Sequence, residues 1–168
     1  MLSVIHVLGS MLMMFSITYL LPAVTSVIYD DGQLVDFVVA ALVCLGAGAV
    51  VWAATRRYKR ELRSRDGFLL VTLAWVLMSV IATVPLLIAI PGLSFTDAFF
   101  ETMSGLSTTG ATVLVGLEHL PPSINMWRAA LHWYGGMGII VLVVAILPLL
   151  GVGGMQLYKA ETPGPVKN

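Results

Sequence analysis

The residues best suited to chemistry lie in one polar stretch of an otherwise apolar chain, FFETMSGLSTTGATVL at positions 99–114. Gly110 can adopt a positive φ, and the β-branched threonines around it stiffen an extended backbone, so that consecutive carbonyl oxygens point the same way. A row of such oxygens can replace the water around an alkali cation. At membrane depth, non-helical backbone is tolerated where it lines a water-filled path or is buried in protein. The stretch therefore predicts an ion-coordinating segment within residues 106–112.

A short helix is expected to position this segment. Ser94 is suited to the N-cap of a helix over residues 95–107, because Asp97 follows three positions later. A helix of that length rises about 20 Å, which is too short to cross a bilayer. Two interpretations stay open on composition alone: a re-entrant helix that ends midway, or an amphipathic helix on the outer surface. A descending helix would aim the partial negative charge of its C-terminus at the ion-coordinating segment.

The composition of the whole chain indicates an integral membrane protein. The 168 residues are 58% hydrophobic and only 11% charged, which leaves too little polar surface for a water-soluble domain. Four segments reach the roughly 20 apolar residues that a membrane span needs: residues 3–28, 34–55, 67–90 and 126–150. We expect an all-α membrane protein with four transmembrane helices and one re-entrant pore helix.

The basic residues indicate the orientation of these helices. Six of the nine lysines and arginines lie between the second and third segments: Arg56, Arg57, Lys59, Arg60, Arg63 and Arg65. Basic loops stay in the cytoplasm, so the N-terminus is expected there, and residues 91–125 begin and end outside. Nucleic-acid binding is not expected, because a short basic connector between apolar helices is better explained by membrane topology. The connector can equally meet anionic lipid.

The order of these segments resembles the first membrane–pore–membrane repeat of the TrkH/TrkG/KtrB family of bacterial potassium uptake proteins. The resemblance rests on LSTTGAT, on HWYGGMGIIVL in the last apolar segment and on the closing LPLLGVGGMQLYKAETPGP. It covers essentially the whole chain, including two helices before the repeat, as in the TrkH branch. It implies a potassium-selective path through the bacterial inner membrane, with four covalently linked repeats of a potassium-channel-like fold around one pore.

The resemblance also implies the residues of the selectivity filter. Gly110 would be its single glycine, and Thr108 and Thr109 would carry the principal oxygens that coordinate potassium. Ala111 and Thr112 would continue the filter outward. Potassium is then the substrate, and no cofactor is expected.

The resemblance divides the chain into three parts. Residues 1–65 form a transmembrane hairpin with its basic cytoplasmic loop, residues 66–158 form the helix–pore loop–helix repeat, and residues 159–168 form a linker or tail. One repeat supplies a quarter of a filter, so we expect a fragment of a four-repeat protein rather than four assembling copies. The implied partners are three further repeats in cis or copies in trans, a second protomer in a homodimer, and a cytosolic nucleotide-binding regulatory subunit of the TrkA type.

Two charged residues near the short helix need partners in apolar surroundings. We expect Glu101 to support the filter from behind, by accepting hydrogen bonds from threonine hydroxyls or backbone amides. Ser107 is assigned to the same support. Arg128 is expected to be an interfacial anchor at the mouth of the last helix, with an ion pair to Glu101 or Glu118 as the alternative.

Three glycines of the last helix, Gly135, Gly136 and Gly138, thin one of its faces. Small residues let the backbones of neighbouring membrane helices approach closely, so we expect this face to pack against another element. Pore lining is the alternative role for the three glycines.

Two other functions are weighed against transport. An intramembrane serine hydrolase would use Ser107 as nucleophile and His132 as base. We expect His132 near the outer surface and Ser107 near mid-membrane, which would separate them, and Thr108 takes the place of a small glycine after the serine. The second alternative is a non-conducting structural or assembly subunit in which the motif only packs. No catalytic chemistry is expected.

Overall fold

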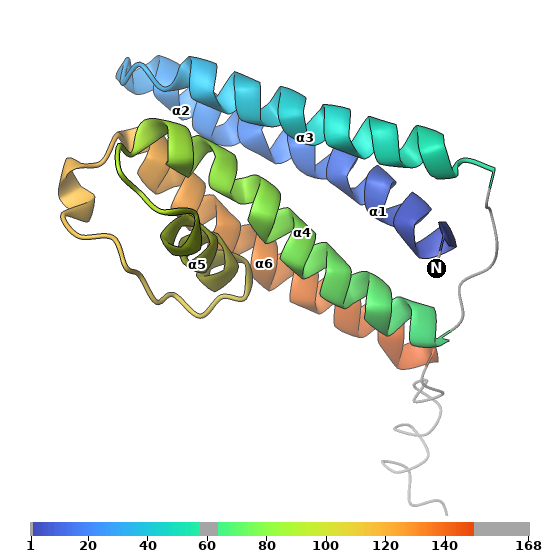
Figure 1. Cartoon of the computed structure of the whole chain (residues 1–168). Helices are drawn as coiled ribbons and strands as arrows, with labels where there is room; N and C mark the ends of the chain where they lie inside the picture. Colours follow the sequence, from blue (N-terminus) through green and yellow to red (C-terminus); the bar gives the residue numbers. More distant parts are fainter. Residues whose placement is uncertain (1, 58–63, 150–168) are drawn as a thin grey trace, which may run out of the picture.

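The computed structural model describes residues 2–57 and 64–149, and its regular elements in these ranges are helices (Figure 1). They are α1 (Leu2–Phe15), the 3₁₀ helix η1 (Ser16–Tyr19), α2 (Leu20–Tyr29), α3 (Leu34–Thr55), α4 (Ser64–Ala89), α5 (Phe95–Leu106), the 3₁₀ helix η2 (Leu117–His119) and α6 (Pro122–Leu149). The expected tail at 159–168, the end of the 66–158 repeat and the basic residues Lys59, Arg60 and Arg63 lie outside the described residues.

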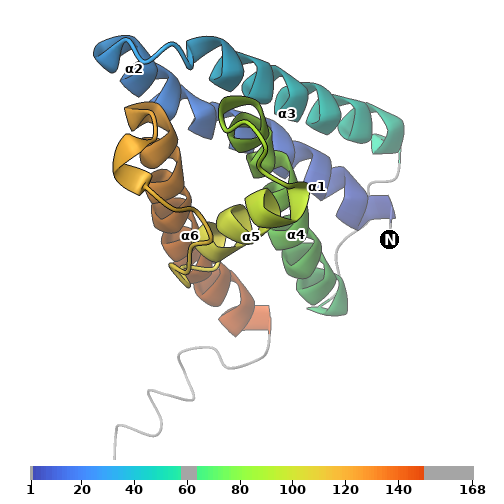
Figure 2. The same ribbon diagram turned by 60° about the vertical axis from the view of Figure 1, so that its left-hand side comes forward.

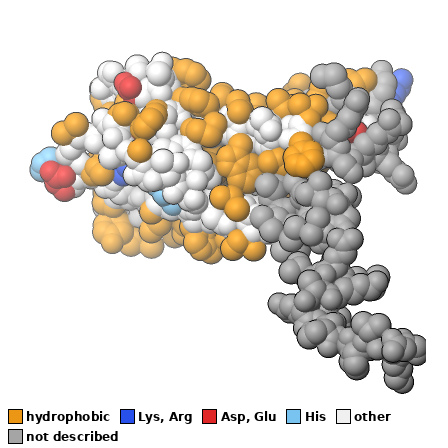
Figure 3. Space-filling model, turned by 90° about the horizontal axis from the view of Figure 1, so that it is seen from below, with side chains coloured by type: hydrophobic (Ala, Val, Ile, Leu, Met, Phe, Trp, Pro, Cys, Tyr) orange, Lys and Arg blue, Asp and Glu red, His pale blue; other side chains and the backbone are white. Residues whose placement is uncertain are grey.

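Among the described residues, three helical stretches are long and apolar enough to cross a membrane: Leu2–Tyr29, Leu34–Thr55 and Asp66–Ala89. Hydrophobic side chains are spread over much of the described surface in Figure 3, as a lipid-facing protein requires. The backbone of α6 covers most of the fourth expected segment, but it begins at Pro122 rather than at residue 126. Proline fits the first position of a helix, because its fixed φ is helical and its missing N–H has no partner there.

The N-terminal hairpin consists of the rod α1–η1–α2 packed along α3 (Figure 1). Two glycines let the helix backbones touch. A Cβ on Gly9 would lie 2.8 Å from the backbone nitrogen of Trp52, and one on Gly48 would lie 2.9 Å from the backbone nitrogen of Met13. The two glycines therefore allow α1 and α3 to pack with their backbones in direct contact.

Two prolines free backbone carbonyls inside the helices, and a tyrosine from another element bonds each one. Pro22 has no N–H for the carbonyl of Thr18, which instead accepts a hydrogen bond from the Tyr134 hydroxyl at 3.5 Å. In the same way, Pro85 of α4 frees the carbonyl of Ile81, which accepts from the Tyr19 hydroxyl at 3.0 Å. The two carbonyls that the prolines leave free thus link the hairpin to helices α6 and α4.

An aromatic cluster at the centre of the molecule joins η1, α4 and α6. Trp127 is fully buried and stacks on Tyr19 with 4.5 Å between ring centroids. Its indole nitrogen donates to the carbonyl of Ala82 at 3.1 Å. Buried aromatic pairs with satisfied polar atoms contribute strongly to core energetics, so this cluster sets the position of α6 relative to α4.

Asp31, in the turn between α2 and α3, caps the distant helix α6. One carboxylate oxygen accepts from the Ser26 hydroxyl at 2.5 Å and from the Gln33 amide at 3.1 Å, and the other accepts from the Ser123 amide at 2.9 Å. Burial alone raises the pKa of Asp31, but these hydrogen bonds outweigh it and hold the pKa below its usual value. Asp31 of the hairpin therefore satisfies one of the free N–H groups in the first turn of α6.

We expect Asp31→Asn to lower the free energy of unfolding by about 2 kcal/mol, because an amide cannot accept all three hydrogen bonds and carries no charge for the helix terminus. The measurement is thermal unfolding of the purified protein in detergent. Because the fold lowers the pKa of Asp31, its contribution is present above the ordinary aspartate pKa and is lost as the pH falls through the folded-state pKa.

The matched control is Asp30→Asn. Asp30 is exposed and has a left-handed backbone with φ of 48°, which asparagine tolerates. Equal losses of stability in the two variants would contradict the capping role of Asp31.

Candidate ion-coordinating site

Helix α5 begins and ends close to the expected residues. The predicted N-cap is confirmed: the Ser94 hydroxyl accepts from the Asp97 amide at 3.1 Å and donates to the Asp97 carboxylate at 2.8 Å. The helix ends at Leu106, with Ser107 as its C-cap. It packs against α4 and α6, and the segment after it turns back toward the end of the molecule where α6 begins (Figures 1 and 2).

The chain reverses after α5 through a Schellman motif. The amide of Thr108 donates to the Gly105 carbonyl and the amide of Thr109 to the Ser104 carbonyl, each at 2.9 Å. Thr108 takes the left-handed position of this motif, with φ of 59°. The expectation that Thr108 stiffens an extended backbone is wrong, because the last carbonyls of the helix capture its amide and the next one. Gly110 has the positive φ expected of it, at 78°.

Residues 109–114 form no regular element and run back beside α5. The Ser104 hydroxyl donates to the Ala111 carbonyl at 2.7 Å. Three further contacts reach Glu101, whose Oε1 accepts from the Thr112 hydroxyl at 2.5 Å and from the Val113 and Leu114 amides at 2.6 and 3.3 Å. The helix therefore holds this segment by side chains rather than by a backbone ladder.

The backbone carbonyls of the segment divide into two groups. The Ala111 carbonyl is engaged by Ser104. Within the described residues, the carbonyls of the other predicted filter residues accept no hydrogen bond, and all of these residues are exposed: Thr108, Thr109, Gly110 and Thr112. Backbone carbonyls are strong acceptors, so this surface needs a polar partner from outside the described chain.

Glu101 and Arg128 form an ion pair behind the segment. The Arg128 Nε donates to Glu101 Oε2 at 3.1 Å, and only 2% of the glutamate side chain and 16% of the arginine side chain are exposed. The alternative expected for Arg128, an ion pair to Glu101 rather than to Glu118, is confirmed, because α6 starts early enough to bring the guanidinium onto α5. The Thr112 hydroxyl and the Val113 amide also donate to this carboxylate, so its charge is satisfied by hydrogen bonds as well as by the arginine.

The glycines of α6 differ in what they contact. A Cβ on Gly135 would overlap the carbonyl group of Leu106, at 2.7 Å from its carbon. A Cβ on Gly138 would lie 3.3 Å from the ring of Trp75, and one on Gly136 would lie 3.8 Å from the Thr108 methyl group. Of the three, Gly135 is the residue that the backbone of the turn requires to be glycine.

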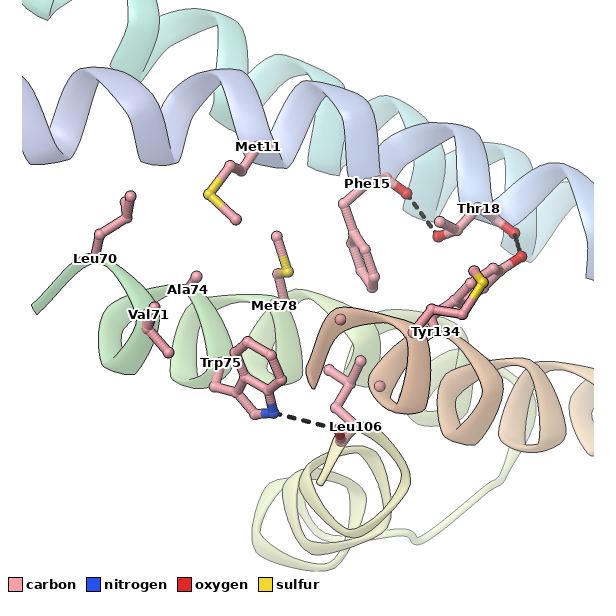
Figure 4. A pocket seen from close by; sticks show the side chains of 13 residues that line it. Met11, Phe15, Thr18, Leu70, Val71, Ala74, Trp75, Met78, Leu106 and Tyr134 are labelled. Carbon is pink, nitrogen blue, oxygen red and sulfur yellow. Dashed lines mark hydrogen bonds between the residues drawn. The ribbon is translucent and has the colours of Figure 1, made fainter. Parts of the chain in front are cut away.

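The Leu106 carbonyl is also held from the side of α4. The indole nitrogen of Trp75 donates to it at 3.2 Å, and both residues line an apolar cavity of about 400 Å³ between the hairpin and helices α4 and α6 (Figure 4). The end of α5 therefore rests on the backbone of α6 at one side and on a hydrogen bond from α4 at the other.

Ser107 and His132 do not form the arrangement that a hydrolase needs. The Ser107 hydroxyl contacts the Thr109 hydroxyl at 2.7 Å, while the Nδ1 of His132 lies 2.8 Å from the Arg128 carbonyl. Within the described residues, no hydrogen bond joins the serine to the histidine. His132 nevertheless lies beside the segment that follows α5, because a Cβ on Gly110 would lie 3.8 Å from its Nε2. The early start of α6 carries this ring down beside the segment.

Sequence reasoning missed three contributors to the site. Ser104 and Trp75 bond backbone carbonyls of the turn, and Asp31 caps α6 from another part of the chain. The i to i+7 spacing of Ser104 and Ala111 gives a weak local signal for the first. The other two contacts join residues 31 and 92 positions apart, which no local pattern reveals.

Comparison with known proteins bears on this site. The chain is 55% identical over 167 residues to the Trk system potassium uptake protein TrkH of Vibrio parahaemolyticus, covering 99% of this chain and 34% of that protein. It is 48% identical to TrkH of Escherichia coli K12, covering 99% and 35%, and 42% identical to the potassium uptake protein TrkG of the same strain, covering 98% and 34%. The chain thus spans about a third of the length of these curated relatives.

A solved structure has the same fold. The crystal structure of the potassium transporter TrkH from Vibrio parahaemolyticus superposes with a TM-score of 0.83 and 50% sequence identity, covering 96% of this chain and 34% of that one. The family model described as "TrkH: Cation transport protein" matches residues 34–168, most of the sequence. The resemblance seen in the motifs is confirmed, and the chain belongs to the TrkH family of cation transport proteins.

Proposed function

We propose that this chain forms one wall of a potassium uptake pathway, with residues 108–112 as its share of the selectivity filter. The observation that carries the proposal is a set of exposed residues whose backbone carbonyls accept no hydrogen bond within the described residues: Thr108, Thr109, Gly110 and Thr112. Such oxygens suit a dehydrated alkali cation. Potassium is the ion named for the relatives, and it is the substrate rather than a resident cofactor.

The arrangement of the helices in the membrane is part of the proposal. Helix α6 is the fourth transmembrane helix, and α5 is re-entrant, with its C-terminus directed at the ion path. Two observations support this assignment. The Glu101 carboxylate is buried and paired, as an ionised group inside a membrane protein must be, and the polar backbone after α5 is held by protein groups. Residues 1–65 then form the supporting hairpin, residues 66–158 the repeat and residues 159–168 a linker.

The proposed partners follow because one repeat supplies only one quarter of a selectivity filter. Three further repeats complete the filter, either in the same polypeptide or as copies, and the span of about a third of the relatives' length favours the same polypeptide. We also propose a bacterial inner-membrane location with the N-terminus in the cytoplasm, a homodimer and a cytosolic regulatory subunit of the TrkA type.

The test uses a chimeric transporter, in which this chain replaces the matching third of TrkH from Vibrio parahaemolyticus. We expect it to restore growth of an uptake-deficient bacterium at limiting potassium. The chain expressed alone serves as the comparison. Growth of the bacterium with this chain alone would favour a filter assembled from several copies of it. A chimeric transporter that reaches the membrane in normal amount without restoring potassium uptake would contradict the proposal and favour a non-conducting structural role.

A further inference from the structure

We propose that Arg128 is a positioning residue for ion selectivity, which holds the outer end of the filter segment and cancels the negative charge of Glu101 behind it. This inference rests on the proposed function and extends it to a residue outside the filter. It starts from the geometry of one guanidinium group on α6.

The guanidinium of Arg128 links the helix to the filter segment at two points. Its Nε donates to Glu101 Oε2 at 3.1 Å, and its terminal nitrogen donates to the Thr112 hydroxyl oxygen at 3.2 Å. The Thr112 hydroxyl in turn donates to the other oxygen of Glu101 at 2.5 Å. The three side chains close a ring of hydrogen bonds, and arginine is the side chain whose fixed fork of donors suits such a ring.

The charge of the ring depends on Arg128. The other groups that donate to Glu101 are neutral: the Thr112 hydroxyl and the amides of Val113 and Leu114. Within the described residues, Arg128 is the one cationic group bonded to this carboxylate. The pair is therefore neutral as a whole, and it adds no net charge to the field that the carbonyl dipoles and the C-terminus of α5 produce at the filter segment.

Removal of the positive charge would change that field. The Glu101 carboxylate directly contacts the backbone amide of Val113, so an uncompensated charge there would add to the field of the carbonyls in a poorly screened environment. Selectivity among alkali cations depends on the field strength of the coordinating oxygens, and a stronger field favours the smaller ion. The neutral pair thus keeps the outer filter suited to potassium rather than to sodium.

The experiment measures potassium and sodium uptake rates of the chimeric transporter at matched membrane amounts. We expect Arg128→Gln to lower the potassium-to-sodium ratio by about tenfold. Arg128→Lys keeps the charge and loses the two-point fork, so its ratio should be intermediate. The double variant Glu101→Gln with Arg128→Gln removes both charges, and its ratio should recover above that of Arg128→Gln alone.

Two controls isolate the effect of the Arg128 charge. Arg57→Gln removes an exposed arginine on the connector and should leave the ratio unchanged. Uptake by the unsubstituted chimeric transporter tests the proposed function, whereas the ratios among its variants test the role of Arg128. Equal ratios in Arg128→Gln, Arg128→Lys and the unsubstituted protein would overturn the inference. A double variant no better than Arg128→Gln would also overturn it, because a loss of packing alone gives that result.

Discussion

Replacement of Gly135 by alanine is expected to destabilise the protein by about 3 kcal/mol and to abolish potassium uptake by the chimeric transporter. The new Cβ would lie 2.7 Å from the carbonyl carbon of Leu106. That neighbour is backbone, and it is fixed further by the hydrogen bond from Trp75, so it cannot rotate away as a side chain would. Helix α6 and the end of α5 must separate, and the filter segment that begins two residues later moves with α5.

Thermal unfolding in detergent and potassium uptake by cells are the two measurements. The matched control is Gly136→Ala, one residue along the same helix, where the added Cβ would lie 3.8 Å from the Thr108 methyl group in ordinary contact. We expect this variant to keep the stability and uptake of the unsubstituted protein. Similar losses in both variants would mean that general packing of this part of α6, and not the contact with Leu106, sets the requirement for glycine.

Gly110→Ala is expected to lower the potassium-to-sodium uptake ratio by about tenfold with little loss of protein from the membrane. Space is available, because the nearest atom to the added Cβ would be the Nε2 of His132 at 3.8 Å. The cost is conformational: a φ of 78° costs an L-residue about 1–2 kcal/mol, so alanine favours a different backbone conformation. Rotation of the peptide planes on either side redirects the carbonyls of Thr109 and Gly110 away from the ion path.

The control for this variant is Gly116→Ala. Gly116 has a similar left-handed φ of 69° but lies beyond the filter segment, at the start of η2. Both alanines should cost similar stability, while only the one at position 110 should change the ratio of uptake rates. If Gly116→Ala altered selectivity as much as Gly110→Ala did, backbone strain anywhere in the outer loop would account for the effect, and the filter assignment of Gly110 would be wrong.

Local features of the fold could be predicted well from the sequence. Long apolar segments gave the positions of the helices, since apolar length is a property of consecutive residues. The N-cap at Ser94 was correct because its partner Asp97 lies three residues away on the same turn. The left-handed Gly110 was correct because the conformational preference of glycine is intrinsic to the residue.

The support of the site could be predicted only in part. Arg128 was assigned mainly to the membrane interface, since the sequence offered Glu101 and Glu118 equally as partners and gave no measure of depth. Helix α6 begins four residues before the expected start. The extra turn places Arg128 against α5 and brings His132 close to Gly110. The first turn of α6 is capped by Asp31, which lies 92 residues before Ser123 in the chain.

The sequence by itself determined the membrane class, the family and the segment whose carbonyls can face an ion. The first depends on composition, and the other two depend on motifs of consecutive residues. The tertiary structure decided which groups hold that segment: Glu101 with Arg128 behind it, and the Leu106 carbonyl on Gly135 below it. Such contacts depend on where two helices cross. The crossing is set by packing and by distant hydrogen bonds, which no local pattern of residues encodes.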